Sequence, residues 1–412
     1  MRLVAIPNYE DYRIDAMFDC YKWDPQFLDH NTLSRYALVL TEQEAKEVAG
    51  FTEKLDIETR NAEAYLNHHL ELTKKLKIPR QIKKELKRMK NYDAEKHIRL
   101  MRYDFHPTKE HKWVISEVNS DVPGGFAEAS LLPLLVCNYI NSKKYVSMNF
   151  GDCLATAITN KIRPKGTIMF VHCTSYSDDR QVMQYIGDHM EALGYRVIYG
   201  ASDHIQFQNK EAVSILDGYQ EKIDCIVRFT PLEWLKDMKP KTWGGYFDTV
   251  TPSCNHPIAI FAQTKRFPLI WDELEKHGIQ LNTWRQLLPH TIEVKEVKGR
   301  SGYIYKPAWG RVGEKISIQE ACDEEEYQAI LKDVKKHPSH YLAQQKFHSM
   351  PLKSPDGTYF HVCLGSYTVD GKHAGFYARM SEKSRIDSEA EDIPVLIERH
   401  LVICQDKNHG SF

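Results

Sequence analysis

Two stretches in the first third of the chain alternate between apolar and polar positions. The polar positions are Arg102 and Asp104 in the first stretch and Glu117 and Asn119 in the second. The apolar positions between them are Met101, Tyr103, Phe105, Val114 and Val118. Because neighbouring side chains of a strand point to opposite faces, the pattern predicts two strands joined by a polar loop at residues 106–111. If the strands pair, one face gathers a guanidinium, two carboxylates and an amide.

The polar face of this predicted hairpin has two interpretations. Carboxylate and amide oxygens suit Mg²⁺, which takes one or two protein carboxylates and completes its shell with water and substrate phosphates. Arginine–carboxylate pairs are also common on solvent-facing strands, where they contribute little to stability. The hairpin alone leaves both a metal site and an ordinary amphipathic hairpin open.

Residues 167–229 carry an alternating strand and helix pattern. Residues 167–173 are a nearly continuous apolar run, as expected for a strand covered on both faces. A helical stretch at 178–193 ends at Gly194, and further strands are predicted at 196–199 and 223–229. This order predicts a small parallel α/β domain, to which we assign residues 161–255. No GxGxxG motif follows the first strand, so a dinucleotide site is not favoured.

Asp178 and Asp179 open the predicted helix of this domain. Acidic residues in a first helical turn are stabilised by the helix dipole, and this explanation is sufficient. The pair also follows the first strand of a parallel sheet, at the edge where ligands of such sheets bind. An amine-binding pair is therefore the functional alternative.

Shorter signals predict elements in the N-terminal part of the chain. Thr41 followed by Glu44 is a capping box, and it opens a helix that extends to about residue 76. A buried helix is predicted at residues 127–140. Residues 1–40 are rich in aromatics and interrupted by prolines, and we expect them to form irregular, packed structure.

A predicted strand at residues 303–306 ends in Lys306. Gly310 and Gly313 follow in a loop, and residues 316–318 are predicted to return as the second strand of a hairpin. The glycines allow the backbone to approach an anion, and the lysine supplies a positive charge. Turns require glycine in any case, so this hairpin alone is weak evidence for phosphate binding.

The C-terminal part of the chain reads as further strands. They are predicted at residues 339–347, 360–367 and 373–379, the last two meeting at the turn Asp370-Gly371. Residues 380–392 are polar and nearly free of apolar anchors, so we expect a mobile loop there.

Composition narrows the class of protein. The chain has 412 residues, 42% of them hydrophobic and 27% charged, with a formal net charge of −1, so no global field attracts nucleic acid. The basic cluster at residues 74–90 lacks interleaved aromatics, and we interpret it as a solvated helical face rather than a nucleic-acid surface.

Nine dispersed cysteines favour reduced thiols. No apolar run is long enough for a membrane span, so we expect a cytoplasmic protein without membrane contact.

Six further motifs are spread over the chain. They are RYD at 102–104, SEVNSD at 116–121, TKRFPLIWDEL at 264–274, YKPAWGRVGEKISI at 305–318, YLAQQ at 341–345 and AGFYARMSEKSRI at 374–386. In these motifs and their order, from about residue 95 onward, the chain resembles the glutathionylspermidine synthetases, a branch of the ATP-grasp carboxylate–amine ligases. The resemblance implies a fold of the α/β (α+β) class, an ATP-grasp fold with a small parallel α/β domain and a glycine-hairpin lid. Residues 1–160 would form the N-terminal part of the core and 256–412 the nucleotide-binding part, with the lid at about 290–345.

The resemblance also implies roles for individual residues. Asp104, Glu117 and Asn119 would bind one or two Mg²⁺ ions. Arg102 would contact the transferred phosphate and Arg379 the reacting acyl group. The residues implied to bind ATP are Lys265, Lys306, Gly310, Arg311, Gly313, Gln344 and Gln345. Those implied to bind the substrates are Asp121, Asp178 and Asp179.

The expected activity is an ATP- and Mg²⁺-dependent ligase that joins a small-molecule acid to an amine through an acyl phosphate. The serines that the family carries after the second strand are replaced by Val122-Pro123-Gly124. The part of the chain that resembles the family contains no amidase region. The substrates therefore need not be glutathione and spermidine. A small-molecule kinase and a non-enzymatic nucleotide-binding protein with a decayed site are the alternatives. A homodimer is compatible with the sequence.

Overall fold

The computed structural model describes residues 1–412 except 24, 91, 111, 141–142, 312 and 400–412. Its largest sheet is antiparallel and six-stranded, in the order β20-β19-β18-β5-β6, with β17 paired to β18. The strands are β5 (Leu100–Pro107), β6 (Trp113–Asn119), β17 (Leu352–Lys353), β18 (Tyr359–Val369), β19 (Lys372–Ser381) and β20 (Glu391–Asp392). The predicted turn at Asp370-Gly371 joins β18 to β19, and both residues have positive φ.

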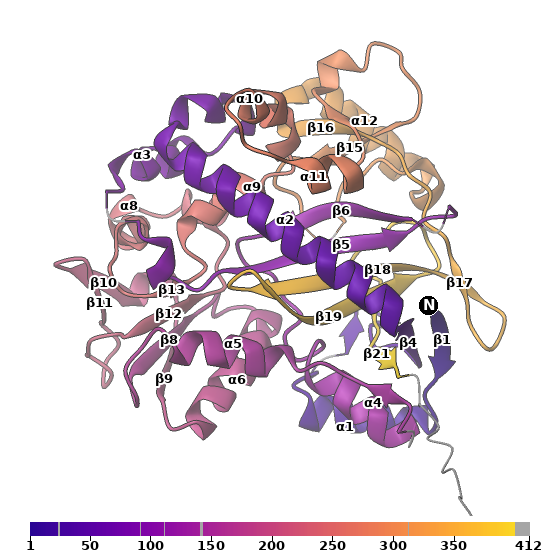
Figure 1. Ribbon diagram of the computed structural model, residues 1–412, viewed down its shortest axis with the longest axis horizontal. Coiled ribbons are helices and arrows are strands. Elements are labelled where there is room, and N and C mark those ends of the chain that lie inside the picture. The colour runs from indigo at the N-terminus through magenta and orange to yellow at the C-terminus, as the bar shows by residue number, and fades with distance from the viewer. Residues whose placement is uncertain (24, 91, 111, 141–142, 312, 400–412) are drawn as a thin grey trace, which may run out of the picture.

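The helix α2 (Glu42–His68) crosses one face of this sheet (Figure 1). Thr41 and Glu44 form the predicted capping box, but the helix ends at His68 and a 3₁₀ turn at Leu70–Leu76 follows. Met101 and Phe105 of β5 are fully buried in the core, and the Tyr103 hydroxyl lies 3.2 Å from that of Thr59 in α2. Burying one such side chain contributes about 1.5–3 kcal/mol, which fixes this face of β5 inward.

The opposite face of β5 and β6 carries the polar residues, as the alternation predicts. Arg102 pairs with Asn119 and Asp104 with Glu117, and the register shifts by one residue directly after Asp104. Such a bulge increases the local twist and re-aims the side chains beside it. The predicted hairpin is confirmed.

The predicted parallel sheet is also confirmed. Its strand order is β13-β12-β8-β9, and every pair in it is parallel. The strands are β8 (Thr167–Val171), β9 (Arg196–Gly200), β12 (Cys225–Arg228) and β13 (Ser253–Cys254). All residues of β8 are buried, and the helices α5 (Phe150–Thr159) and α6 (Ser177–Ala192) pack beside the sheet (Figure 1).

The glycine hairpin predicted at residues 303–318 is wrong in its second strand. β15 (Tyr303–Pro307) pairs with β16 (Tyr341–Gln345), which in turn pairs with β14 (Thr291–Ile292). Residues 316–318 form no strand, although the Ser317 amide donates to the Tyr305 carbonyl at 3.1 Å. The first four residues of β16 are buried, and it takes the place of the predicted return strand beside β15, with helix α12 (Glu324–Lys336) between the two strands in sequence.

The prediction of irregular structure for residues 1–40 is wrong. β1 (Arg2–Ala5) and β4 (Tyr36–Thr41) belong to a sheet of order β1-β4-β21-β7, with α1 (Tyr9–Asp19) between them in sequence. β21 (Val395–Glu398) lies parallel to β4, and β7 (Tyr145–Val146) completes the sheet. Tyr36–Leu40 is buried throughout, because this strand is central in a sheet that its partners from distant sequence complete.

The predicted helix at residues 127–140 begins later, and α4 spans Leu131–Ile140. The remaining helices are α3 (Arg80–Arg88), α7 (Leu232–Leu235), α8 (Pro240–Trp243), α9 (Ile260–Gln263), α10 (Trp271–Lys276) and α11 (Asn282–Leu287). The remaining strands are β2 (Gln26–Phe27), β3 (His30–Asn31), β10 (Ile205–Gln208) and β11 (Glu211–Ser214). Within the described ranges, no helix has both the length and the apolar character that crossing a bilayer requires.

Candidate functional site

A cavity of about 690 Å³ lies where the polar face of β5 and β6 meets β15, β19 and the start of α6. A space of this size suits a small-molecule site. The predicted site residues that line it are Arg102, Asp104, Glu117, Asn119, Asp178, Asp179, Lys306, Arg311, Gly313 and Arg379. These residues are far apart in sequence, and the fold brings them together.

Arg102, Asp104 and Asn119 form one hydrogen-bonded group on the hairpin. The Arg102 guanidinium donates to both Asp104 carboxylate oxygens, at 2.8 and 3.1 Å, and the Asn119 amide donates to one of them at 3.0 Å. Burial and the neighbouring Glu117 raise the pKa of Asp104, and Arg102 opposes that rise. The result is a compact set of oxygen atoms with an adjacent guanidinium.

Gly365 of β18 makes room for Arg102. A Cβ atom at Gly365 would lie 2.8 Å from Cδ of Arg102, closer than side chains pack. The guanidinium also donates to the Gly124 carbonyl at 2.9 Å and lies 4.9 Å from the centre of the Tyr377 ring. The side chain is therefore held from three sides.

Two lysines approach Glu117 from different segments. The Lys265 ammonium lies 2.7 Å from the Glu117 carboxylate, and Lys306 donates to the Ser116 carbonyl at 3.2 Å. Burial favours the neutral acid, but Lys265, Lys306 and Arg102 outweigh it and lower the pKa of Glu117. Burial lowers the pKa of Lys306 to about 8. The two lysines thus concentrate positive charge beside the hairpin carboxylates.

The glycine loop packs over the cavity in contact with two other segments. Arg311 donates twice to one carboxylate oxygen of Glu233 in α7, at 2.9 and 2.7 Å. Gly313 has a φ of +67°, and a Cβ there would lie 2.3 Å from the Ile386 carbonyl oxygen. Gly310 accepts a hydrogen bond from Lys265 through its carbonyl. These contacts hold the loop against α7 and the 384–387 segment.

The segment at residues 380–392 is anchored by ion pairs, which its composition did not predict. Arg385 pairs with Glu326 of α12 at 2.7 Å and with Asp387 at 2.9 Å. Arg379, on the strand that leads into this segment, donates to the Ala390 carbonyl at 2.8 Å. The segment therefore forms part of the cavity wall.

Asp178 and Asp179 also line the cavity, from the first turn of α6. Neither makes an ion pair with another described residue. Burial, together with the neighbouring Asp178, raises the pKa of Asp179 to about 6. The pair supplies negative charge at a place separate from the lysines.

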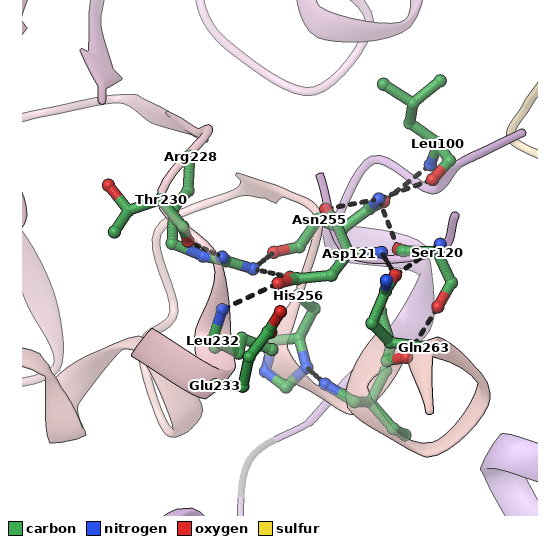
Figure 2. A network of polar contacts seen from close by, with 12 residues as sticks. Leu100, Ser120, Asp121, Arg228, Thr230, Leu232, Glu233, Asn255, His256 and Gln263 are labelled. Carbon is green, nitrogen blue, oxygen red and sulfur yellow. Dashed lines mark hydrogen bonds and ion pairs between the residues drawn. The ribbon is translucent and has the colours of Figure 1, made fainter. Parts of the chain in front are cut away.

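Asp121 does not reach this cavity. Both of its carboxylate oxygens are occupied, one by the Arg228 guanidinium and the other by the Leu232 amide at 2.8 Å (Figure 2). Asp121 and Arg228 are fully buried. Its side chain therefore ties the end of β6 to β12 and α7 and is not available to a substrate.

Gln344 and Gln345 also lie outside the cavity lining. Gln344 is buried and donates to the Thr291 hydroxyl at 3.2 Å, and Gln345 is exposed. The next residues in the chain, Lys346 and Phe347, line a second cavity of about 300 Å³. That cavity shares Ile304, Ile318 and Phe347 with the first.

Lys22, Glu128, Tyr377 and Asp392 are among the residues of the main cavity that sequence reasoning missed. Tyr377 lies inside the motif at residues 374–386, and it shares a face of β19 with Arg379, so the alternation of this strand could have indicated it. Lys22 comes from the N-terminal segment, where no local pattern indicated a site.

Comparisons with known proteins identify the family of the chain. A family model described as glutathionylspermidine synthase preATP-grasp matches residues 17–398. No curated protein matches the chain at a significant level. A glutathione synthetase-like effector from Globodera pallida, solved in its apo form, is similar in fold, with a TM-score of 0.64, 14% identity, and coverage of 95% of this chain and 99% of its own.

A putative γ-glutamylcysteine synthetase from Methylobacillus flagellatus is more distant, with a TM-score of 0.42, 11% identity, and coverage of 81% of this chain and 86% of its own. At 14% identity the Globodera pallida structure supports the fold alone. The family model spans nearly the whole chain and includes every residue of the cavity described above. The chain belongs to the glutathionylspermidine synthase preATP-grasp family.

Proposed function

We propose that this protein is an ATP- and Mg²⁺-dependent ligase that joins a carboxylate to an amine through an acyl phosphate. Membership of the synthase family supports a ligase-type role. The observation that carries the finer proposal is the single cavity shared by the carboxylates of β5 and β6 and the buried lysine of β15. Oxygen ligands and cations side by side are what a metal-bound triphosphate requires.

The hairpin residues fit Mg²⁺. Among the described residues, no cluster of three or more His, Cys, Asp or Glu side chains could enclose a metal ion. Mg²⁺ does not need one, because it is usually bound by one or two carboxylates together with water and phosphate oxygens. Asp104, Glu117 and Asn119 would hold the ion, which neutralises negative charge on the transferred phosphate.

The cations of the cavity fit the phosphates of ATP. Phosphoryl transfer needs little covalent help from the protein and depends on positioning and charge neutralisation. Lys265 and Lys306 would neutralise the triphosphate, and Arg102 and Arg379 the transferred phosphate and the acyl group. At about 4 Å, a pair of unit charges gains roughly 1 kcal/mol in water and roughly 4 kcal/mol at an effective dielectric of 20. Closure of the cavity therefore strengthens each of these contacts.

Apolar side chains next to Lys306 suit the nucleotide base. Ile304 lies two residues before Lys306 on β15, so their side chains share one face of the strand. Ile304, Ile318 and Phe347 border both cavities. We propose that the base stacks on Phe347 between the two isoleucines, and that the side chains of Gln344 and Gln345 do not contact it.

The acidic pair of α6 fits the amine substrate. Asp178 and Asp179 would bind the ammonium group, and the glycine loop around Arg311 would cover the acyl phosphate and exclude water from it. After the ammonium loses a proton, the neutral amine would attack the acyl phosphate, and the amide forms as the bond to phosphate breaks and inorganic phosphate leaves. We propose that the reaction takes place in the cytoplasm, in keeping with the free cysteines among the described residues.

The proposal is tested with purified protein, ATP, Mg²⁺ and pooled peptides and polyamines. We expect phosphate release that depends on both an acid and an amine, together with a product whose mass equals their sum less one water. Phosphate found on the acceptor, with no amide, would instead identify a kinase. No nucleotide turnover with any acceptor pool would contradict the proposal.

A further inference from the structure

Lys22 is a buried lysine in the wall of the main cavity. Its side chain is 9% exposed, and its ammonium lies 3.0 Å from the Glu128 carboxylate and 2.6 Å from one carboxylate oxygen of Asp392. Burying an ammonium ion is costly unless it is paired, and here two carboxylates pair it. The N-terminal segment thereby reaches a site built mostly from residues beyond position 100.

Asp392 is shared between Lys22 and two residues of β19. Its second carboxylate oxygen accepts a hydrogen bond from the Tyr377 hydroxyl at 2.7 Å. The same oxygen lies 3.7 Å from Nε of Arg379, which is beyond hydrogen-bond distance. Arg379 is thus ion-paired with Asp392 at long range without a hydrogen bond to it, and its one hydrogen bond within the described residues goes to the Ala390 carbonyl.

The charges around Asp392 balance only if Lys22 is present. Asp392 and Glu128 carry two negative charges, and Lys22 and Arg379 carry two positive charges. Without Lys22, Arg379 would be the nearest remaining cation to an unpaired, buried carboxylate. Attraction between opposite charges rises as their separation falls and is strong in a poorly solvated site. Arg379 would then be drawn onto Asp392.

We propose that Lys22 is a positioning residue, which satisfies Asp392 so that the Arg379 guanidinium stays available to an anionic ligand in the cavity. The inference rests on the proposed function, in which Arg379 contacts the acid substrate or its acyl phosphate. It assigns a role to the N-terminal segment in setting the geometry of the reacting end of the site.

A purely structural lysine would behave differently from a positioning one. If Lys22 only anchors the N-terminal segment, its loss lowers stability, and removal of the Asp392 charge brings no recovery. If Lys22 holds Asp392 away from Arg379, removal of the Asp392 charge in the same protein releases Arg379 again. The double variant therefore separates the two roles.

The kinetic experiment measures ATP turnover and thermal unfolding for Lys22→Gln, Lys22→Arg and the double variant Lys22→Gln/Asp392→Asn. We expect Lys22→Gln to lower kcat by about tenfold or more with little change in the KM for ATP, because a reacting group is misplaced. Lys22→Arg should restore most of kcat, and so should the double variant. A double variant no more active than Lys22→Gln would overturn the proposal.

Arg99 offers a matched control. It is a second buried cation held by two carboxylates, Asp56 at 3.0 Å and Glu63 at 2.5 Å, and it does not line the main cavity. Arg99→Gln should lower the unfolding temperature as Lys22→Gln does, yet leave kcat within about twofold. An equal loss of kcat in both variants would mean that Lys22 acts through stability alone, against the proposal.

A crystal structure of Lys22→Gln tests the same point without any assay. We expect Nε of Arg379 to move from 3.7 Å to hydrogen-bond distance from Asp392. An unchanged Arg379 would overturn the proposal.

Because the wild-type protein is assayed first, failure of the proposed function appears as absent wild-type turnover, and failure of the positioning role appears as an unmoved Arg379. If Lys22→Gln does not fold, Asp392→Asn alone must keep most of the wild-type kcat.

Discussion

Single residues in the cavity derive their chemistry from their neighbours. Glu117 is kept ionised by Lys265, Lys306 and Arg102, although burial acts in the other direction. Burial acts more strongly on Asp104, and together with the neighbouring Glu117 it raises the pKa of this carboxyl despite the ion pair with Arg102. The ionised acid and its lysines are the part of the site most sensitive to a change of charge.

Glu117→Gln should abolish nucleotide turnover, by about 10²-fold or more, because it removes a charge that the metal and lysines require. The side chain is at the cavity and not in the apolar core, so the thermal midpoint should stay within about 5 °C. Phosphate release and thermal unfolding measure the two effects. Glu211→Gln, which removes a carboxylate from an exposed ion pair with Lys222, is the control and should change neither. Wild-type turnover in Glu117→Gln would count against the metal site.

Nucleotide affinity should depend on the protonation of Lys306, whose pKa burial lowers to about 8. The lysine is mostly cationic at pH 7 and mostly neutral at pH 9, so affinity should fall as the pH rises, by up to about tenfold. Calorimetric titration with an ATP analogue at both pH values measures this, and binding at pH 8 should take up protons. Lys306→Arg keeps its charge and should bind equally at both. A wild-type affinity that does not vary between pH 7 and 9 would refute the role of Lys306.

At the scale of elements, buried polar contacts align the hairpin with the parallel sheet. Asn255, next to β13, donates to the Ser120 carbonyl at 2.8 Å and accepts from the Leu100 amide at 2.6 Å, so it bridges the end of β6 and the start of β5 (Figure 2). Arg228 of β12 pairs with Asp121 beside it. The carboxylates of the hairpin are thereby fixed relative to α6 and α7.

Asp121→Asn should destabilise the fold rather than weaken substrate binding. It leaves the Arg228 charge buried and unpaired, which typically costs about 3–5 kcal/mol. Urea unfolding measures this loss, and the KM values of the folded fraction should stay within about twofold. A stable variant with a raised KM for the acid substrate would instead indicate that Asp121 contacts the substrate.

Substitution by alanine should raise stability at one glycine of the chain and lower turnover at another. Gly50 lies inside α2 with nothing within 4 Å of an added Cβ, so Gly50→Ala should stabilise the protein by about 0.5–1 kcal/mol. An added Cβ at Gly365 meets Arg102, so Gly365→Ala should displace that guanidinium and lower turnover. Thermal unfolding and kcat of both variants test this difference. Full turnover in Gly365→Ala would mean that Arg102 need not be held in place.

The elements that sequence predicts well are those whose partners are near in the chain. The β5–β6 hairpin and the strands around α6 follow from local alternation and apolar runs, because each packs against its sequence neighbour. The return strand of the glycine hairpin and the sheet of β1, β4 and β21 could not be predicted in this way, since their pairing joins segments distant in sequence. The motifs led to most of the charged residues of the cavity, but not to Lys22, because its contact with the site depends on Asp392 at the other end of the chain.

At the scale of the whole molecule, distant parts of the chain meet at one cavity. The N-terminal segment supplies Lys22, the hairpin supplies Asp104 and Glu117, and the C-terminal strands supply Arg379 and Asp392. Helix α2 covers the apolar face of the largest sheet (Figure 1), and the polar face of β5 and β6 lines the cavity. Because the packed core and the site lie on opposite faces of the sheet, we expect substitutions in the site to have modest effects on stability.

The most direct test is a crystal structure of the protein with Mg²⁺ and a non-hydrolysable ATP analogue. The account predicts the metal at Asp104, Glu117 and Asn119, the triphosphate within reach of Lys265 and Lys306, and the base against Phe347. A nucleotide bound elsewhere, or these side chains turned away from it, would contradict the account.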